Sequence, residues 1–299
     1  NNIVMSSSTF DDEGIKKYYK DVDQRKNLKV ATIFAYKGKT KYGYNADTER
    51  VASQAMIWTV SGGFFDSSSE NLSSDENTIL NRIYAPSSAD HKNLVDCYKK
   101  MKGDILNYYK IPAGATTAVR TAPTYELKYN TSTKKYEGTI KADSSISQFD
   151  FSKVDGVTFK KDGSNIKVSA NENIKAGTKT VTLTKTKAKN SGAIEDCVPL
   201  VFQTKDNSTK SQMKVGYISG KDPVQAYIKL KISTGSAHLD KSFTDYFGNA
   251  QTATADMYKS VKFQLACKVG DGYKFVKASG SDGSYSFTDL ASQATDLTP

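Results

Sequence analysis

The hydrophobic pattern of the chain changes period near Thr121, and this change constrains the fold more than any other feature. Before it, apolar residues recur every three or four positions, which is the period of an amphipathic helix. After it, short runs rich in Val, Ile, Thr, Tyr and Phe alternate with Lys and Ser, which is typical of strands. A chain of 299 residues is long enough for two or three domains. The sequence therefore predicts an α+β, multi-domain protein with its helices first.

The clearest helical pattern lies between Ser88 and Lys110. Its apolar stripe consists of Leu94, Tyr98, Met101, Ile105 and Tyr108. Ser87 or Ser88 can cap the start, and Pro112 and Gly114 follow the end.

A second helix is expected around Val51, Ala55 and Trp58, which recur at helical spacing after a plausible cap at Asn45. A shorter helix is expected around Leu28–Tyr36. These three segments make up a helical region that we place at residues 1–118.

Residues 119–232 are expected to form an antiparallel β-sandwich, because turn residues separate many short apolar runs. The expected strands are 157–159, 166–168, 181–183, 200–202, 213–215 and 227–230. A third segment, 233–299, adds expected strands at 261–265, 273–276 and 284–287, which account for only part of an immunoglobulin-like or prealbumin-like sandwich. Strands do not alternate with helices, so a parallel nucleotide-binding sheet is not expected.

Several chemistries are poorly supported by this composition. With two histidines, His91 and His238, a histidine-based metal site or a Ser–His–Asp triad is not expected. The three cysteines lie far apart and form no C-x-x-C pair, so we predict neither a zinc site nor a disulfide framework. The acidic residues 11–13, 21 and 23 lack calcium-loop spacing and fit helix starts. No phosphate-binding or hydrolase motif occurs, so we predict no cofactor, no metal and no conventional enzyme.

The net charge is +10, and lysines recur along the expected strands. This pattern favours solvated strand faces over an anionic partner such as a wall polymer or nucleic acid. No Arg/aromatic module of a nucleic-acid binder is present, so we predict no nucleic-acid partner. No stretch approaches the roughly 20 apolar residues of a membrane span, so none is expected in this chain.

The segment Ala52–Trp58, with the sequence ASQAMIW, resembles the T-Q-x-[ALM]-I-W signature of thioester domains. These domains occur at the tips of Gram-positive surface adhesins and of some pili. Ser53 stands where the family usually has Thr. The Tyr/Gly-rich residues 35–44 resemble the family's approach to the motif, and residues 222–230 resemble the strand that closes its sandwich. The resemblance covers roughly residues 10–232.

The resemblance implies an internal thioester. A cysteine thiol attacks the glutamine amide, ammonia leaves, and an incoming amine later replaces the sulfur. By resemblance, Gln54 is the acyl donor, Ser53 and Trp58 belong to the motif, and Trp58 helps to shield the bond. The implied partner is an amine, such as a lysine, on a host or neighbouring surface protein. The implied location is extracellular, on the bacterial cell surface or cell wall.

The family's cysteine lies upstream of the glutamine, and no cysteine occurs between Asn1 and Gln54. Three explanations are open: the cysteine precedes residue 1, Cys97 has taken the role, or the site is dead and only its scaffold remains. Cys97 lies beside Tyr98 of the apolar stripe, and a cysteine in that position is usually an inert core residue.

The third segment has a resemblance of its own. Residues 239–249, 261–265 and 283–287 look like the start of a pilin-like collagen-adhesin B-type module. Such modules form an isopeptide bond between a first-strand Lys and an Asn near the last strand. Lys241 is the candidate lysine, and its partner would lie after Pro299. Adjacent modules of the same surface protein or fibre are then further partners.

The sequence leaves three functions open. The first is a covalent, or formerly covalent, surface adhesin. The second is a non-reactive structural subunit of a stalk, fibre or pilus. The third is a carbohydrate- or wall-binding module that uses exposed tyrosines.

Overall fold

The structure is a computed structural model that describes residues 5–130, 132–172, 174–204, 214–233, 237–254, 256–257, 263–269, 272–277 and 284–287. The chain forms two compact units. The first contains Asn1–Pro112, Ser144–Asp150 and Leu183–Ala226, and the second contains Ala113–Asp143, Phe151–Thr182 and Tyr227–Pro299. These units follow spatial contacts rather than sequence order. The division at 1–118, 119–232 and 233–299 stays a prediction.

The helices of the first unit begin at side chains that cap them. They are α1 (Glu13–Tyr18), α2 (Val22–Phe34), α3 (Ala46–Ser61), α4 (Ser74–Ile83) and α5 (Ala89–Asn107). Asn45 caps α3 and Ser88 caps α5, which confirms both expectations. Asp12 and Asp21 cap α1 and α2, so the early acidic residues do mark helix starts. The sequence pattern missed the short helices α1 and α4.

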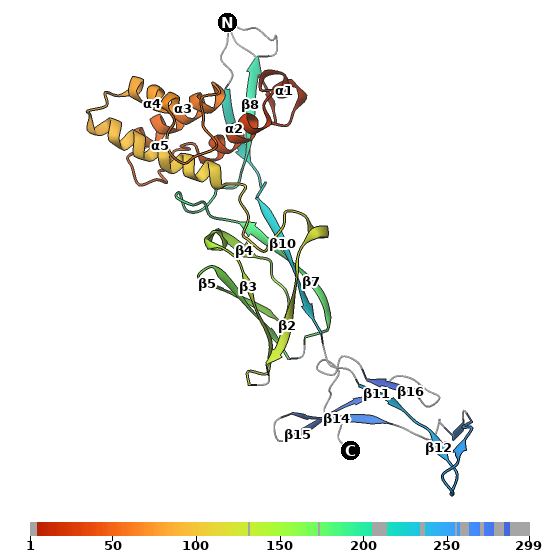
Figure 1. The fold of residues 1–299 in the computed structure, drawn as a ribbon. Coiled ribbons are helices and arrows are strands. Elements are labelled where there is room, and N and C mark those ends of the chain that lie inside the picture. Colours follow the sequence, from red (N-terminus) through yellow and green to blue (C-terminus); the bar gives the residue numbers. More distant parts are fainter. Residues whose placement is uncertain are drawn as a thin grey trace. The chain divides into compact units, whose positions relative to one another are not determined.

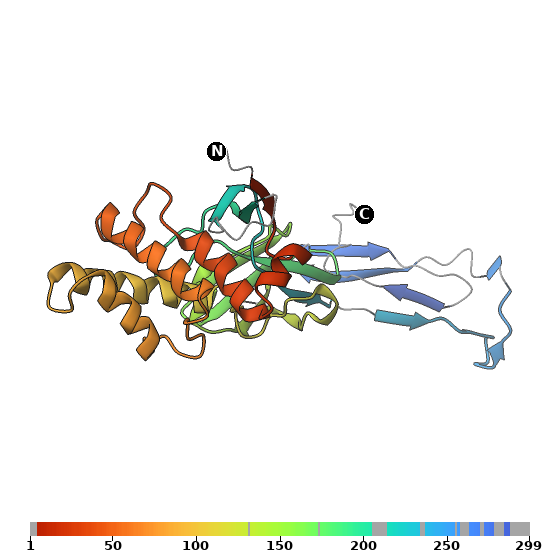
Figure 2. The same cartoon turned by 90° about the horizontal axis from the view of Figure 1, so that it is seen from above.

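Helices α2, α3 and α5 lie beside one another in Figures 1 and 2 and enclose the core of this unit. The predicted stripe of α5 is confirmed, since all five of its residues are buried. The interpretation of α3 was wrong at one position. Ala55 is fully buried, but Trp58 is 46% exposed. The buried face of α3 instead carries Ala52, Ala55, Met56, Thr59 and Val60.

The C-terminal end of α5 is held by a lysine from a distant strand. Lys185, at the end of β7 (Gly177–Lys185), is 3% exposed. Its Nζ donates to the backbone oxygens of Asn107, Tyr108 and Lys110, at 2.9 Å for Tyr108. Burial lowers the pKa of Lys185 to about 8. A cation at the negative end of the helix satisfies carbonyls that lack partners within the helix.

The first unit also contains a three-stranded sheet in the order β1 (Met5–Ser8), β8 (Cys197–Thr204), β9 (Lys214–Ser219). Both neighbouring pairs are antiparallel. The predicted strand at 200–202 is confirmed within β8. The predicted strand at 213–215 is confirmed from Lys214 on, and residue 213 lies outside the described residues.

A seven-stranded sheet has the order β4-β7-β10-β2-β3-β6-β5. Besides β7 it contains β2 (Thr124–Asn130), β3 (Lys135–Lys141), β4 (Phe149–Phe151), β5 (Val157–Asp162), β6 (Asn165–Asn171) and β10 (Gln225–Ile232). The expectation of a wholly antiparallel arrangement is wrong, because β10 pairs with β2 in parallel. A parallel pair needs a long connection. Here the chain between β2 and β10 contains the other five strands of the sheet.

The second unit buries one side of these strands. In β6 the residues Ile166, Val168 and Ala170 are buried, and the residues between them are not. In β10 the same alternation buries Ile228, Leu230 and Ile232. One face therefore packs inward while the other meets solvent.

The third segment contains two-stranded pairs. They are β11 (Ala237–Asp240) with β16 (Ser284–Phe287), β12 (Phe243–Thr244) with β13 (Ala250–Gln251), and β14 (Gln264–Val269) with β15 (Gly272–Lys277). The strands expected at 273–276 and 284–287 are confirmed. Of the strand expected at 261–265, residues 261 and 262 lie outside the described residues. An immunoglobulin-like sandwich stays a prediction.

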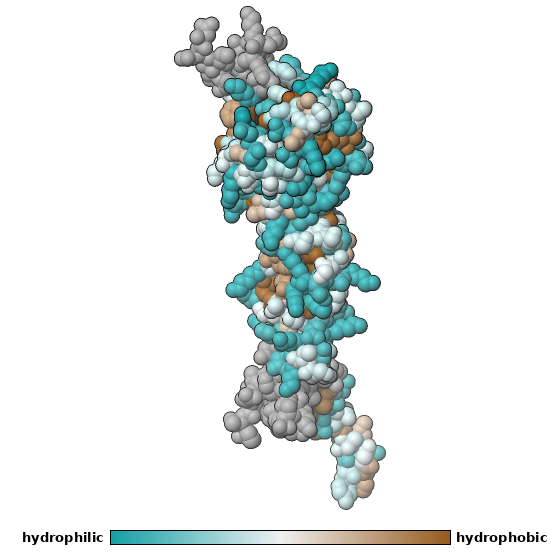
Figure 3. All heavy atoms as spheres, turned by 90° about the vertical axis from the view of Figure 1, so that its left-hand side faces the viewer, coloured by the Kyte–Doolittle hydropathy of each residue, from teal (hydrophilic) through white to brown (hydrophobic). Residues whose placement is uncertain are grey.

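Hydrophilic side chains cover much of the face drawn in Figure 3. Among the helices that the structure describes, none is long and apolar enough to cross a membrane.

Replacing Asn45 by Ala tests the start of α3. The Asn45 side chain accepts a hydrogen bond from the backbone N–H of Thr48 at 2.8 Å. Its loss is expected to destabilise the first unit by about 1 kcal/mol. Differential scanning calorimetry of the chain measures the change. Asn45→Asp keeps the acceptor and should preserve the transition temperature, and equal losses in both variants would contradict the capping role.

Candidate functional site

The glutamine motif lies in the first half of α3. Ser53 is 6% exposed, whereas the side chain of Gln54 is exposed. Trp58 lies four residues after Gln54, so both belong to the exposed side of the same helix. An amine in solution can therefore approach Gln54. No contact between Gln54 and Trp58 is described, so shielding by Trp58 stays a prediction.

Ser53 joins α3 to the segment that precedes it. Its hydroxyl donates to the backbone oxygen of Glu49 at 2.7 Å and accepts the backbone N–H of Tyr36 at 2.8 Å. Tyr36 follows directly on Ala35, which ends α2. The upstream segment that the thioester resemblance singles out is thus bonded to the residue next to Gln54.

A buried carboxylate fixes the rest of that segment. Glu49 is 1% exposed and accepts the backbone N–H groups of Lys41, Tyr42 and Tyr44 at 2.7, 2.8 and 3.3 Å. The hydroxyl of Tyr42 then donates to Asp104 of α5 at 3.1 Å. The sequence analysis did not find Glu49, because an acid in the first turns of a helix ordinarily needs no partner outside it.

Cys97 lies on α5, as predicted, and is fully buried. Burial raises the pKa of its thiol to about 12, and the negative charge of Glu49 adds to this effect. At neutral pH the thiol is therefore protonated. No described contact joins Cys97 to Gln54, and its role as thiol partner stays a prediction.

A second free thiol, Cys197, lies 7% exposed at the start of β8. Burial raises its pKa as well. Two largely buried lysines from the segment after α2 lie in this region. Lys37 and Lys41 both pair with Glu195, at 3.8 and 3.1 Å. Burial and the neighbouring Lys41 charge lower the pKa of Lys37.

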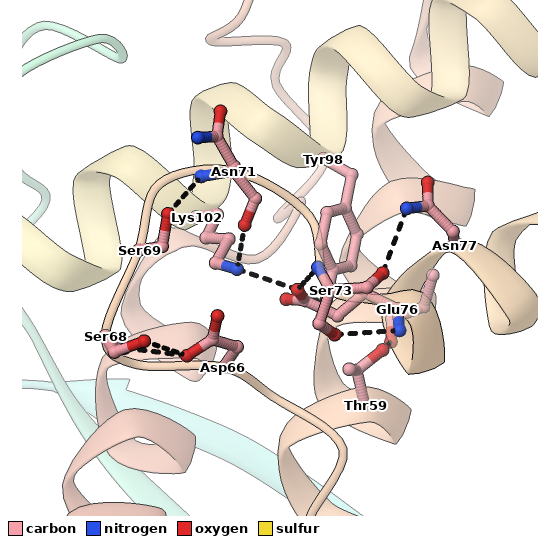
Figure 4. Close-up of polar contacts among 11 residues, drawn as sticks. Thr59, Asp66, Ser68, Ser69, Asn71, Ser73, Glu76, Asn77, Tyr98 and Lys102 are labelled. Atoms are coloured by element: carbon pink, nitrogen blue, oxygen red, sulfur yellow. Dashed lines mark hydrogen bonds and ion pairs between the residues drawn. The ribbon is translucent and has the colours of Figure 1, made fainter.

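The most deeply buried charges form an ion pair between two helices. Lys102 of α5 and Glu76 of α4 are both fully buried, and Nζ lies 2.7 Å from Oε2. Lys102 also donates to the backbone oxygen of Asn71 at 2.7 Å, and Tyr98 donates to the other carboxylate oxygen at 3.2 Å. Figure 4 shows these groups pointing toward one another beneath the loop that leads into α4.

Glu76 has a second role in the same network. Its carboxylate accepts the backbone N–H of Ser73 at 2.7 Å, and the Ser73 hydroxyl accepts the N–H of Glu76 at 3.2 Å. This capping box starts α4. The pair thus bonds the backbone of Asn71 and Ser73 in the segment that leads into α4. We therefore assign the pair to structure rather than to chemistry.

The remaining candidate lies in the third segment. Lys241 is half-buried, and its Nζ lies 4.9 Å from the centre of the Phe243 ring. This contact suits a cation over an aromatic face. No isopeptide partner of Lys241 occurs among the described residues, and the bond stays a prediction. The described part of the chain also contains no cluster of three or more residues suited to a metal ion.

No family model matches the chain, and no curated protein matches it. Among solved structures, it is similar to the thioester domain of the Staphylococcus aureus TIE protein, with a TM-score of 0.41 and 15% identity over 76% of this chain and 75% of that one. A second is the thioester domain of the Enterococcus faecium TIE86 protein, with a TM-score of 0.24 and 14% identity over 71% of each chain.

A third is the Bacillus anthracis TIE protein, with a TM-score of 0.27 and 9% identity over 89% of this chain and 47% of that chain. These TM-scores are too low for the likeness alone to assign a fold or a function.

The burial of Cys97 can be tested by thiol labelling at pH 8. An unfolded thiol with a pKa near 8.5 is about one-quarter ionised there, whereas a pKa of about 12 leaves almost no thiolate. Iodoacetamide should therefore label Cys97 only after denaturation in urea, as read by peptide mass spectrometry. Equal labelling rates in buffer and in urea would show that the thiol is accessible.

The ion pair can be tested by removing one or both charges. Lys102→Met leaves a buried carboxylate without its counter-charge and should destabilise the first unit by about 3–5 kcal/mol. Adding Glu76→Gln removes that charge and keeps a capping-box side chain, so the double variant should recover part of the loss. Calorimetry measures both. A double variant less stable than the single one would refute this assignment.

Proposed function

We propose that this chain is the head region of a bacterial cell-surface adhesin, in which Gln54 is the acyl donor to amines on a host or neighbouring surface. One observation carries the proposal. Gln54 is exposed next to a buried Ser53, which bonds the upstream segment to α3. An acyl donor must be accessible to its amine, and its helix must hold it in place.

The reaction conserves atoms in two steps. A thiol gives up its proton, and the resulting thiolate attacks the side-chain carbonyl of Gln54. The carbon–nitrogen bond then breaks, the leaving nitrogen takes up that proton, and ammonia departs to leave a thioester. An amine then attacks the thioester, which forms an amide and frees the thiol. The first step requires a thiolate that reaches Gln54. The protonated, buried Cys97 does not meet that requirement in the described arrangement.

The burial of the thiols favours a second candidate function. In this alternative the chain is a non-reactive structural subunit of a surface stalk or fibre, and Gln54 is an ordinary exposed side chain. Cys97 and Cys197 then serve only as small apolar residues of the core, which is the usual role of buried cysteine.

Intact-mass measurement distinguishes the two functions. A thioester lowers the mass by about 17 Da through the loss of ammonia, and methylamine should then add to the protein and release a thiol. Gln54→Ala should abolish both effects. Gln251→Ala, at another exposed glutamine, should leave them unchanged. An unshifted mass with no methylamine incorporation would refute the acyl-donor role and leave the structural subunit.

A further inference from the structure

The outward side of strands β2, β3, β6 and β5 carries a set of lysines that we name the lysine face. Its members are Lys128, Lys135, Lys141, Lys160 and Lys167. All five are exposed, while the alternating residues of β3 and β6 point into the second unit. The four strands are consecutive neighbours in the sheet, so these lysines share one continuous surface.

The strand register places two lysines directly opposite each other. Lys160 of β5 pairs with Lys167 of β6, and Lys167 in turn lies opposite Thr139 of β3. Side chains in such a pair start about 4.5–5.5 Å apart, and like charges there are destabilising. Lys167 contacts Asp162 at 2.6 Å. No ion pair is described for Lys160, Lys128, Lys135 or Lys141 within the described ranges.

Three acids share this face with the lysines: Glu126 of β2, Glu137 of β3 and Asp162 of β5. Glu137 lies directly opposite Lys128. Glu137 is bonded by Asn130 and Thr133, at 2.8 and 2.9 Å. Residues 113–143 and 151–182 together contain eleven lysine and arginine residues against six acidic ones. These residues therefore keep a net charge of +5 (11 − 6) after their acids are counted.

Apart from these acids, the other outward residues of the four strands are short and polar. They are Thr124, Asn130, Thr139, Thr158, Asn165, Ser169 and Asn171. The outward positions of these four strands, all within the described residues, contain no arginine and no aromatic residue. Single-stranded nucleic acids are held by stacking on aromatic rings, which this face cannot provide. Lysine ammonium groups act as separate point charges, without the bidentate geometry of arginine.

We propose that the lysine face binds a flexible polyol-phosphate polymer. Such a polymer carries one negative charge on each short, flexible repeat. Successive phosphates can therefore follow unevenly spaced lysines across a flat sheet, and the short hydroxyl and amide side chains can donate to phosphate oxygens. The interaction is electrostatic, depends on salt, and needs neither Gln54 nor a thiol.

The test uses the full chain and purified poly(glycerol phosphate), with binding measured by biolayer interferometry at several salt concentrations. Lys160→Gln with Lys167→Gln should weaken binding about tenfold at low salt and reduce the salt slope by roughly 0.7 for each lysine removed. The control is Lys92→Gln with Lys99→Gln, which removes the same charge from exposed positions of α5. That control should bind like the parent chain. Circular dichroism should show that all variants remain folded.

Three results would overturn the proposal. The first is no binding of the polymer by the parent chain at low salt. The second is equal weakening in the two double variants, which would make net charge and not this face responsible. The third is equal affinity for single-stranded DNA or heparin, with equal sensitivity to the Lys160/Lys167 substitutions, which would make the face a general polyanion surface.

Discussion

The first unit depends on the buried carboxylate of Glu49. By accepting three backbone N–H groups, it turns the segment after α2 into a fixed loop on α3. The loop places the Tyr42 hydroxyl where it donates a hydrogen bond to Asp104. Asp104 also accepts the backbone N–H groups of Asn190 and Ser191 at 2.6 and 3.0 Å. Two buried carboxylates thereby hold the segment 41–44 on α3 and residues 190–191 on α5. Burial raises the pKa of Asp104, while its hydrogen bonds oppose that rise.

Local features of this fold could be predicted from the sequence, and nonlocal ones could not. Caps such as Asn45 and Ser88 bond to residues three positions ahead, so their signal is complete within one turn. The stripe of α5 likewise follows from periodicity. The parallel pairing of β10 with β2 joins strands about one hundred residues apart in sequence, and no local pattern encodes such a register. Lys102 and Glu76 read as ordinary charged helix residues until the fold buries them.

At the candidate site, too, the local features could be predicted from the sequence and the nonlocal contacts could not. Periodicity and motif placed Gln54 on a helix, and the structure leaves it exposed. Periodicity also placed Trp58 with the apolar residues, but the core is filled by the smaller residues on the other side of α3. What periodicity could not reveal is how Ser53 and Glu49 bond the preceding segment, because both contacts depend on a loop folding back on the helix.

Gln54 and the lysine face would act through different physics. Acyl transfer is a single irreversible event that requires a thiolate. The thiols of Cys97 and Cys197 are both buried. The lysine face needs no activation, because its side chains are exposed and attract anions directly. Lys160 and Lys167 lie directly opposite each other, and Asp162 offsets part of their repulsion by pairing with Lys167 at 2.6 Å. An anionic polymer bound across both lysines would offset the rest of that repulsion, which is a physical reason for a sheet to tolerate the pair.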